Sequence, residues 1–153
     1  MNILVLCTGN SARSILLEAI LNASGRVTAY SAGSQPKGVV HPQSIALLAA
    51  KGYPTAGLRC KSWDEFSTPD APVMDAVITV CGSAAAETCP MWPGTPVRAH
   101  WGVEDPAGAA DEPAAFLLAY TLLKAKADAL LALPFDLMDA DKLKATLIRA
   151  GHG

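Results

Sequence analysis

The sequence has no long hydrophobic run and no excess of charge of either sign. Charged residues make up 17% of the 153 residues and the net charge is −2, so electrostatics give no reason to expect nucleic acid or a membrane surface as a partner. A membrane-spanning helix needs about 20 apolar residues, and the longest candidate, residues 116–133, is interrupted by Lys124, Lys126 and Asp128. The apolar N-terminal run is short and lacks a basic flank, so we expect no signal peptide and a cytoplasmic location.

Cysteine is also scarce. The four cysteines are Cys7, Cys60, Cys81 and Cys89, and in a reducing compartment they are expected to be thiols or redox centres rather than structural disulfides. Cys60 lies in an irregular segment with no partner motif, so we interpret it as a bystander. Apolar residues reach 51%, enough for a core. We predict a single domain over residues 1–153, with residues 134–153 as a C-terminal helical extension.

Hydrophobic patterns predict strands that alternate with helices. Short apolar or alternating runs predict strands at residues 3–7, 26–31, 75–81 and 95–101. Helical patterns cover residues 15 to about 22, 42–51, 113–133 and 139–150. Compact strand–helix–strand units imply parallel strands. The predicted fold class is therefore α/β, a three-layer α/β/α arrangement with a four-stranded parallel sheet.

The first stretch of the chain places a cysteine at the end of a strand and an arginine at the start of a helix. Turn residues separate Cys7 from Arg13, and a loop entering a helix points backbone N–H groups and the positive end of the helix dipole at one spot. Such a nest fits a tetrahedral oxyanion, and Arg13 can bind two of its oxygens with its planar fork. The same field should lower the pKa of Cys7 to roughly 3.5–7.5.

We therefore predict an oxyanion-binding loop, or P-loop, in which Cys7 is an ionised nucleophile. The oxyanion-binding residues would be Thr8, Gly9, Asn10, Ser11, Ala12, Arg13 and Ser14. Asn10 and Ser11 would hold the loop, Ser14 could donate a hydrogen bond to Cys7, and Gly9 suits either a positive φ or a close backbone approach. The alternative is a buried strand-end cysteine with Arg13 as a surface charge. Ser11 and Ser14 would then be ordinary helix caps, a role that is also compatible with the oxyanion site.

The segment Cys7-Thr8-Gly9-Asn10-Ser11-Ala12-Arg13-Ser14 resembles the active-site loop of the low-molecular-weight protein tyrosine phosphatase superfamily. It is most similar to the arsenate reductases that share that fold, and the resemblance runs from Met1 to about Leu133. Residues 100–108 resemble a late loop of these enzymes, which implies that Asp105 is the general acid that protonates the leaving oxygen. Without the resemblance, an aspartate before Pro106 is mostly a turn former.

Two further cysteines favour a reductase over a phosphatase. A phosphatase needs one cysteine because water completes its reaction, whereas a reductase must deliver two electrons and needs a second thiol. Residues 80–90 resemble the redox segment of thioredoxin-linked arsenate reductases, although Cys81 and Cys89 are one residue further apart. The resemblance implies a relay: Cys7 attacks arsenate, Cys81 attacks Cys7, Cys89 attacks Cys81, and thioredoxin or a glutaredoxin-type protein reduces the last disulfide. Alternatively, Cys81 and Cys89 are buried apolar thiols or, with His100, zinc ligands.

The same relatives bind a potassium ion near the loop, and Asn10, Glu18 and Ser31 match three of its ligands. No other cofactor or metal is expected. Two alternative functions stay open. One is a phosphatase that hydrolyses phosphotyrosine or small phosphate esters through a Cys7 phosphocysteine, although no aromatic residue follows Asp105 and Pro106 closely. The other is a non-catalytic oxyanion-binding module.

Overall fold

The observed elements follow the predicted alternation of strands and helices. The fold is that of a computed structural model, which describes residues 1–82, 92 and 95–152. In chain order the elements are β1 (Asn2–Cys7), α1 (Arg13–Ala23), β2 (Thr28–Gly33), α2 (Pro42–Ala50), η1 (Trp63–Phe66), β3 (Ala76–Thr79), β4 (Val97–His100), α4 (Glu112–Leu131), η2 (Phe135–Leu137) and α5 (Ala140–His152). Each predicted strand and helix is present, with ends that differ by one or two residues.

Strand β1 lies inside the sheet, which explains its continuous apolar sequence. The strand order is β2-β1-β3-β4 and every pair is parallel. A parallel strand covered on both faces is apolar throughout, and Ile3 to Leu6 are fully buried. Cys7 pairs with Gly33 of β2, and Leu6 pairs with Thr79 of β3. The carboxyl ends of these strands therefore meet at one edge, where open α/β sheets bind their ligands.

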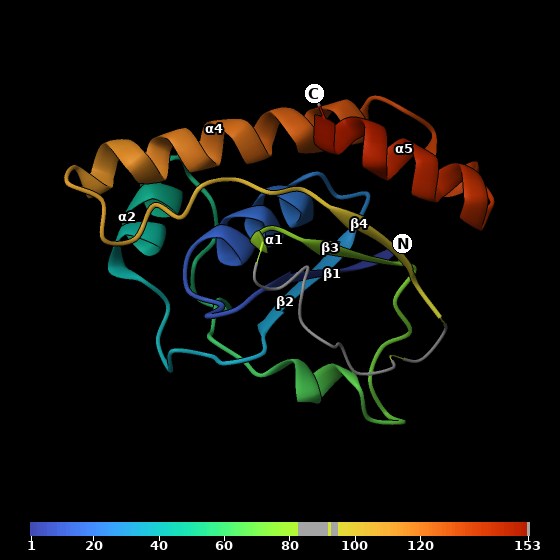
Figure 1. Cartoon of the computed structure of the whole chain (residues 1–153), viewed down its shortest axis with the longest axis horizontal. Coiled ribbons are helices and arrows are strands. Elements are labelled where there is room, and N and C mark those ends of the chain that lie inside the picture. The colour runs from blue at the N-terminus through green and yellow to red at the C-terminus, as the bar shows by residue number, and fades with distance from the viewer. Residues whose placement is uncertain (83–91, 93–94, 153) are drawn as a thin grey trace.

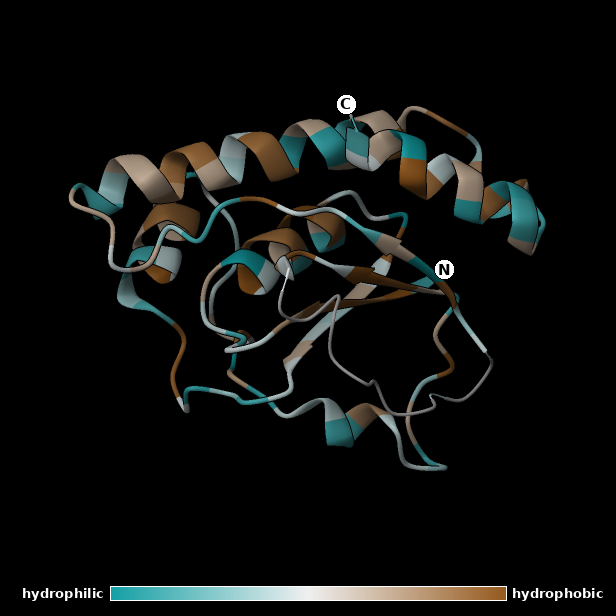
Figure 2. Ribbon diagram, in the orientation of Figure 1, coloured by the Kyte–Doolittle hydropathy of each residue, from teal (hydrophilic) through white to brown (hydrophobic). Residues whose placement is uncertain are grey.

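Each face of the sheet is covered by its own layer (Figure 1). Ile3 and Val5 belong to the core that lies between the sheet and the helices α1, α4 and α5. Leu4 and Leu6 point to the other face, because side chains alternate along a strand, and pack there near η1. Figure 2 shows hydrophobic residues filling the central strands and alternating with hydrophilic ones along α4. The predicted three-layer α/β/α class with a four-stranded parallel sheet is confirmed.

Helix α5 packs against the edge of the sheet at β4. Its residues Leu143 and Leu147 are buried in the same core as α4. The indole Nε1 of the fully buried Trp101 donates a hydrogen bond of 2.8 Å to the Leu147 carbonyl. Among the described residues, no helix combines the length and the apolar content that a bilayer crossing requires.

Candidate active site

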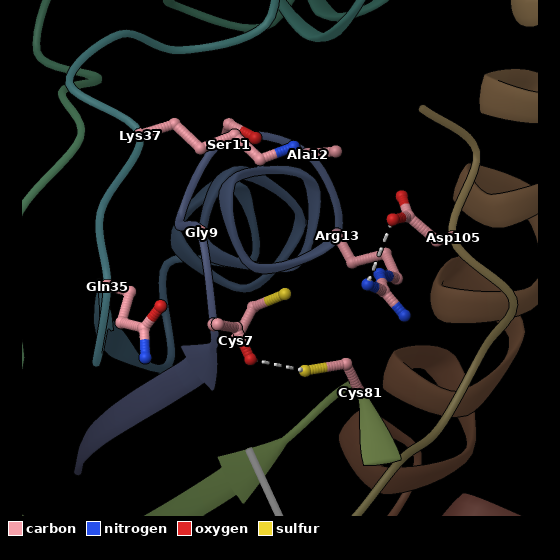
Figure 3. A pocket seen from close by; sticks show the side chains of 10 residues that line it. Cys7, Gly9, Ser11, Ala12, Arg13, Gln35, Lys37, Cys81 and Asp105 are labelled. Carbon is pink, nitrogen blue, oxygen red and sulfur yellow. Dashed lines mark hydrogen bonds and ion pairs between the residues drawn. The ribbon is translucent and has the colours of Figure 1, made fainter. Parts of the chain in front are cut away.

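A pocket opens where β1 ends and α1 begins. Its volume is about 420 Å³, and Figure 3 shows Cys7 and Arg13 from the first strand–loop–helix unit around it, together with Cys81 and Asp105 from two later segments. The lining residues are Cys7, Thr8, Gly9, Ser11, Ala12, Arg13, Gln35, Lys37, Cys81 and Asp105. Most residues of the predicted site thus meet at one place. Asn10 and Ser14 are buried behind the lining, and Cys89 lies outside the described residues.

Three carbonyl groups of the loop accept hydrogen bonds from a neighbouring segment of backbone. Those of Thr8, Gly9 and Ser11 accept hydrogen bonds from the backbone N–H groups of Gln35 (3.0 Å), Lys37 (3.1 Å) and His41 (3.0 Å). In a trans peptide unit the N–H group points opposite to the carbonyl. The N–H groups that follow these carbonyls therefore point away from residues 35–41, and that of Gly9 contacts Cys7, which is compatible with a nest for an anion. Helix α1 also begins without a side-chain cap, so the first N–H groups of its backbone are available to an anion.

Asn10 fixes the shape of the loop from behind. Its φ is 47°, a left-handed conformation that asparagine tolerates better than most residues. Its amide Nδ2 donates to Ser14 Oγ and to Ser31 Oγ, both at 2.9 Å, and its Oδ1 accepts from the Lys61 N–H at 2.8 Å. The sequence suggested a positive φ for Gly9. The positive φ occurs instead at Asn10, whose side-chain hydrogen bonds stabilise this conformation.

Arg13 has its guanidinium at the edge of the pocket, where its Nη1 and Nη2 face the Val103 carbonyl and Asp105. Its Nη1 donates to the Val103 carbonyl at 3.0 Å, and its Nη2 lies 3.6 Å from Asp105 Oδ2. Its Nε is buried and has no hydrogen-bond partner in the part of the chain that the structure describes. A buried donor without a partner costs free energy, and an oxyanion bound between Arg13 and the loop would supply the missing acceptor.

The pKa of Cys7 does not follow the sequence prediction. Its hydrogen bond with Cys81 and its burial raise the pKa, whereas the Arg13 guanidinium and the Gly9 N–H lower it. The raising effects dominate. The prediction of a thiolate at neutral pH is therefore wrong for this arrangement of the site. It considered the positive groups near Cys7 but not the contact between the sulfurs of Cys7 and Cys81.

Cys81 reaches the pocket from the end of β3. It follows that strand by two residues, is 4% exposed, and contacts Cys7 as well as Thr8, whose Oγ1 lies 3.6 Å from the Cys81 sulfur. Two thiols consequently share one anion pocket (Figure 3). The pairing of Cys81 with Cys89 falls outside the described residues and stays a prediction.

Asp105 approaches the pocket from the loop before α4. Its side chain is 51% exposed, its Oδ2 faces Arg13, and its Oδ1 accepts a hydrogen bond of 3.0 Å from the Ala107 N–H. The Asp-Pro segment therefore forms a turn and also borders the pocket. Both sequence interpretations of Asp105 are compatible with this position.

Sequence reasoning missed three residues around the loop. Gln35 and Lys37 line the pocket, and they follow β2 at the same sheet edge, which is the signal that could have found them. Cys60, interpreted as a bystander, donates from its sulfur to the Gly9 carbonyl at 3.2 Å and accepts from the Gly38 N–H at 3.3 Å. It supports the loop from outside and does not line the pocket.

Comparisons with known proteins identify the family of the chain. The model of the family described as low molecular weight phosphotyrosine protein phosphatase matches residues 2–144. The chain belongs to this family. The arsenate reductase of Bacillus licheniformis is 36% identical over 107 residues, which are 68% of this chain and 73% of that protein. The family resemblance seen in the sequence is confirmed.

Two solved structures of arsenate reductases also align with the chain. The arsenate reductase of Archaeoglobus fulgidus is 26% identical with a TM-score of 0.69, and the alignment covers 86% of this chain and 99% of that one. An arsenate reductase in a phosphate-binding state is 25% identical with a TM-score of 0.70, covering 86% and 96%.

In this family member, Gly33 allows β2 to lie directly against the predicted oxyanion-binding loop, residues 8–14, which we call the anion loop. A Cβ atom at Gly33 would overlap the Thr8 carbonyl oxygen and lie 3.0 Å from that of Cys7. We expect Gly33→Ala to lower the melting temperature by about 4–10 °C and to weaken phosphate binding, because the backbone of the loop must move. Calorimetry of unfolding and of phosphate binding measures both effects. Gly57→Ala is the matched control, since its Cβ would meet nothing within 4 Å; equal losses in both variants would contradict the prediction.

A buried ion pair lies behind the loop of this family member. Lys61 Nζ is 3.7 Å from Glu18 Oε1, and their side chains are 6% and 10% exposed. Burial raises the pKa of Glu18 and lowers that of Lys61, while each charge opposes the effect of burial on the other. Sequence reasoning had assigned no role to Lys61.

Proposed function

We propose that this protein reduces arsenate to arsenite, with Cys7 as the nucleophile and Cys81 as the thiol that resolves its adduct. The observation that carries the proposal is the second thiol inside the anion pocket, in contact with the first. Hydrolysis of a phosphate ester leaves Cys81 without a role, whereas reduction of arsenic(V) needs two thiols to supply two electrons. The names of the relatives, which are arsenate reductases, support the same reaction.

Arsenate enters as an oxyanion held by the loop and Arg13. The Cys7 sulfur bonds to arsenic, one arsenic–oxygen bond breaks, and the departing oxygen leaves as water after receiving a proton from Asp105. The thiol proton of Cys7 restores the proton of Asp105, so the sum of the step is a thiol plus arsenate giving a thiol adduct plus water. The donors in the pocket stabilise the charge on the remaining oxygens.

The second step is reductive. The Cys81 sulfur attacks Cys7, the sulfur–arsenic bond breaks, and its electron pair stays on arsenic, which leaves as arsenite with the Cys81 proton. Cys7 and Cys81 are oxidised together to a disulfide. We propose that Cys89 then attacks Cys81 and that thioredoxin or a glutaredoxin-type dithiol reduces the resulting Cys81–Cys89 disulfide.

The test is arsenate-dependent oxidation of NADPH, coupled through thioredoxin and thioredoxin reductase, with arsenite measured as the product. We expect one arsenite for each NADPH, and competition by phosphate. Cys89→Ser should release one arsenite per protein molecule and then stop, because Cys7 and Cys81 have become a disulfide that the reductase system cannot reach.

Other outcomes would contradict the proposal in defined ways. Multiple turnovers by Cys89→Ser with a glutaredoxin system would mean that the external partner, and not Cys89, reduces the Cys7–Cys81 disulfide. No arsenite with any dithiol, together with hydrolysis of an aryl phosphate, would leave a phosphatase. Phosphate binding without either reaction would leave an oxyanion-binding module.

A further inference from the structure

The ammonium group of Lys61 occupies a cage of oxygens behind the anion loop. Its Nζ donates to the Arg59 carbonyl at 2.7 Å and to Ser31 Oγ at 3.4 Å, and lies 3.7 Å from Glu18 Oε1. An ammonium has three donors, and three oxygens surround this one. Ser31 in turn donates its hydroxyl proton to Glu18 Oε1 at 2.5 Å, so the carboxylate is bound from two sides.

This cage is joined to the residue that shapes the loop. Asn10 donates to Ser31 Oγ, and its Oδ1 accepts the backbone N–H of Lys61. Lys61 thus contacts Asn10 through its main chain and reaches it a second time through Ser31. Because Asn10 has a positive φ, its conformation depends on these contacts.

A potassium ion does not fit among these residues. The resemblance assigns Asn10, Glu18 and Ser31 as ligands, but Lys61 already contacts one oxygen of each. Asn10 Oδ1 accepts its backbone N–H, Ser31 Oγ accepts from its ammonium, and Glu18 Oε1 lies 3.7 Å from that ammonium. An added cation would also meet the Lys61 charge at close range in a buried place, where like charges repel strongly. The site therefore contains a positive charge that belongs to the chain.

We propose that Lys61 is a positioning residue that serves as an internal monovalent cation, so that the anion loop is held in its binding shape without potassium. Its ammonium balances Glu18 and holds Ser31, and Ser31 accepts a hydrogen bond from Asn10. The proposal predicts that stability and anion binding of the natural protein do not respond to potassium. It also predicts that removing the Lys61 side chain creates such a response, because a buried carboxylate is left without its cation.

The experiment compares the unfolding temperature in potassium chloride and in choline chloride at equal ionic strength. We expect Lys61→Ala to lose about 10 °C in choline. Potassium at about ten times its Kd should return about 4 °C. The natural protein should unfold at the same temperature in both salts.

Lys126→Ala is the matched control for the loss of a buried lysine. Lys126 is 9% exposed and its Nζ donates to the Gly151 carbonyl, far from the loop in the sequence. Its loss should lower stability without any response to potassium. The double variant Glu18→Gln with Lys61→Ala removes both charges, so it should be more stable than Lys61→Ala alone and should not respond to potassium. This variant keeps the test valid if Lys61→Ala does not fold.

A second measurement separates positioning from general stability. The Kd of phosphate should rise at least tenfold in Lys61→Ala and recover when potassium replaces choline, while Lys126→Ala keeps the natural Kd. A potassium response equal in Lys61→Ala and Lys126→Ala, a double variant no more stable than the single one, or a natural protein stabilised by potassium would each overturn the proposal. None of these measurements uses arsenate, so the result does not depend on the proposed reaction.

Discussion

Replacement of Arg13 by lysine is expected to lower kcat/KM for arsenate by about 10²–10³-fold although the charge is kept. The guanidinium is a planar fork whose donors match two oxygens of a tetrahedral anion, whereas an ammonium is a single point of charge. One arm already binds the Val103 carbonyl, and among the described residues the buried Nε has no partner. Lysine has no donor at the position of Nε, so the charge that develops on the anion loses one fixed hydrogen bond. Loss of one such donor typically lowers the rate by about 10²–10³-fold.

The measurement is steady-state kinetics with arsenate, together with the Kd of phosphate. Arg149→Lys is the control, because Arg149 is an exposed residue of α5 and should keep both values. A fall in kcat/KM accompanied by an equal rise in the phosphate Kd would mean that Arg13 binds the ground state and the transition state equally. An unchanged kcat/KM in Arg13→Lys would remove Arg13 from the reaction.

The part of the site that is contiguous in the sequence could be predicted without a structure. Cys7, the turn and Arg13 form one strand–loop–helix unit, and the geometry of such a unit is local. Cys81 could be placed because parallel strands bring their carboxyl ends to one edge. Asp105 came from the resemblance of its loop alone, since an Asp-Pro pair by itself indicates only a turn.

The residues that support the loop could not be predicted, because they reach it through tertiary packing. Lys61 is 51 positions from Asn10 and Cys60 is 51 positions from Gly9 along the chain, and neither belongs to a local motif. The direction of the Cys7 pKa shift was predicted wrongly for the same reason. The shift depends on a contact with Cys81, which lies 74 positions further along the chain. The helix dipole and Arg13, by contrast, lie close to Cys7 in the sequence.

Replacement of Cys81 by alanine is expected to change two properties of the site in opposite directions. Turnover with arsenate should fall by about 10³-fold or more, because no thiol is left inside the pocket to attack the Cys7 adduct. Alkylation of Cys7 by iodoacetamide at neutral pH should instead become faster. The hydrogen bond with Cys81 is the largest cause that raises the pKa of Cys7, so its removal leaves burial opposed by Arg13 and the Gly9 N–H.

The sign of the pH effect follows from which form reacts. The thiolate is the nucleophile, and a raised pKa keeps Cys7 protonated to higher pH. Lowering that pKa moves the midpoint of the alkylation profile to lower pH, and each unit increases the rate tenfold while the pH stays below the pKa. Mass spectrometry of the peptide that contains Cys7 follows this residue apart from the other cysteines. Bound phosphate should slow the alkylation, because it occupies the same pocket.

Cys60→Ala is the control that distinguishes a thiol inside the pocket from a thiol beside it. Cys60 also contacts the loop, through the Gly9 carbonyl, yet it does not line the pocket. Its replacement removes a contact outside the pocket, so it should retain turnover and should not move the Cys7 midpoint to lower pH as Cys81→Ala does. If Cys81→Ala slows alkylation of Cys7, Cys81 favours the thiolate and the direction assigned to its hydrogen bond is wrong. If it keeps full turnover, another thiol resolves the adduct, and the contact between Cys7 and Cys81 has no part in the reaction.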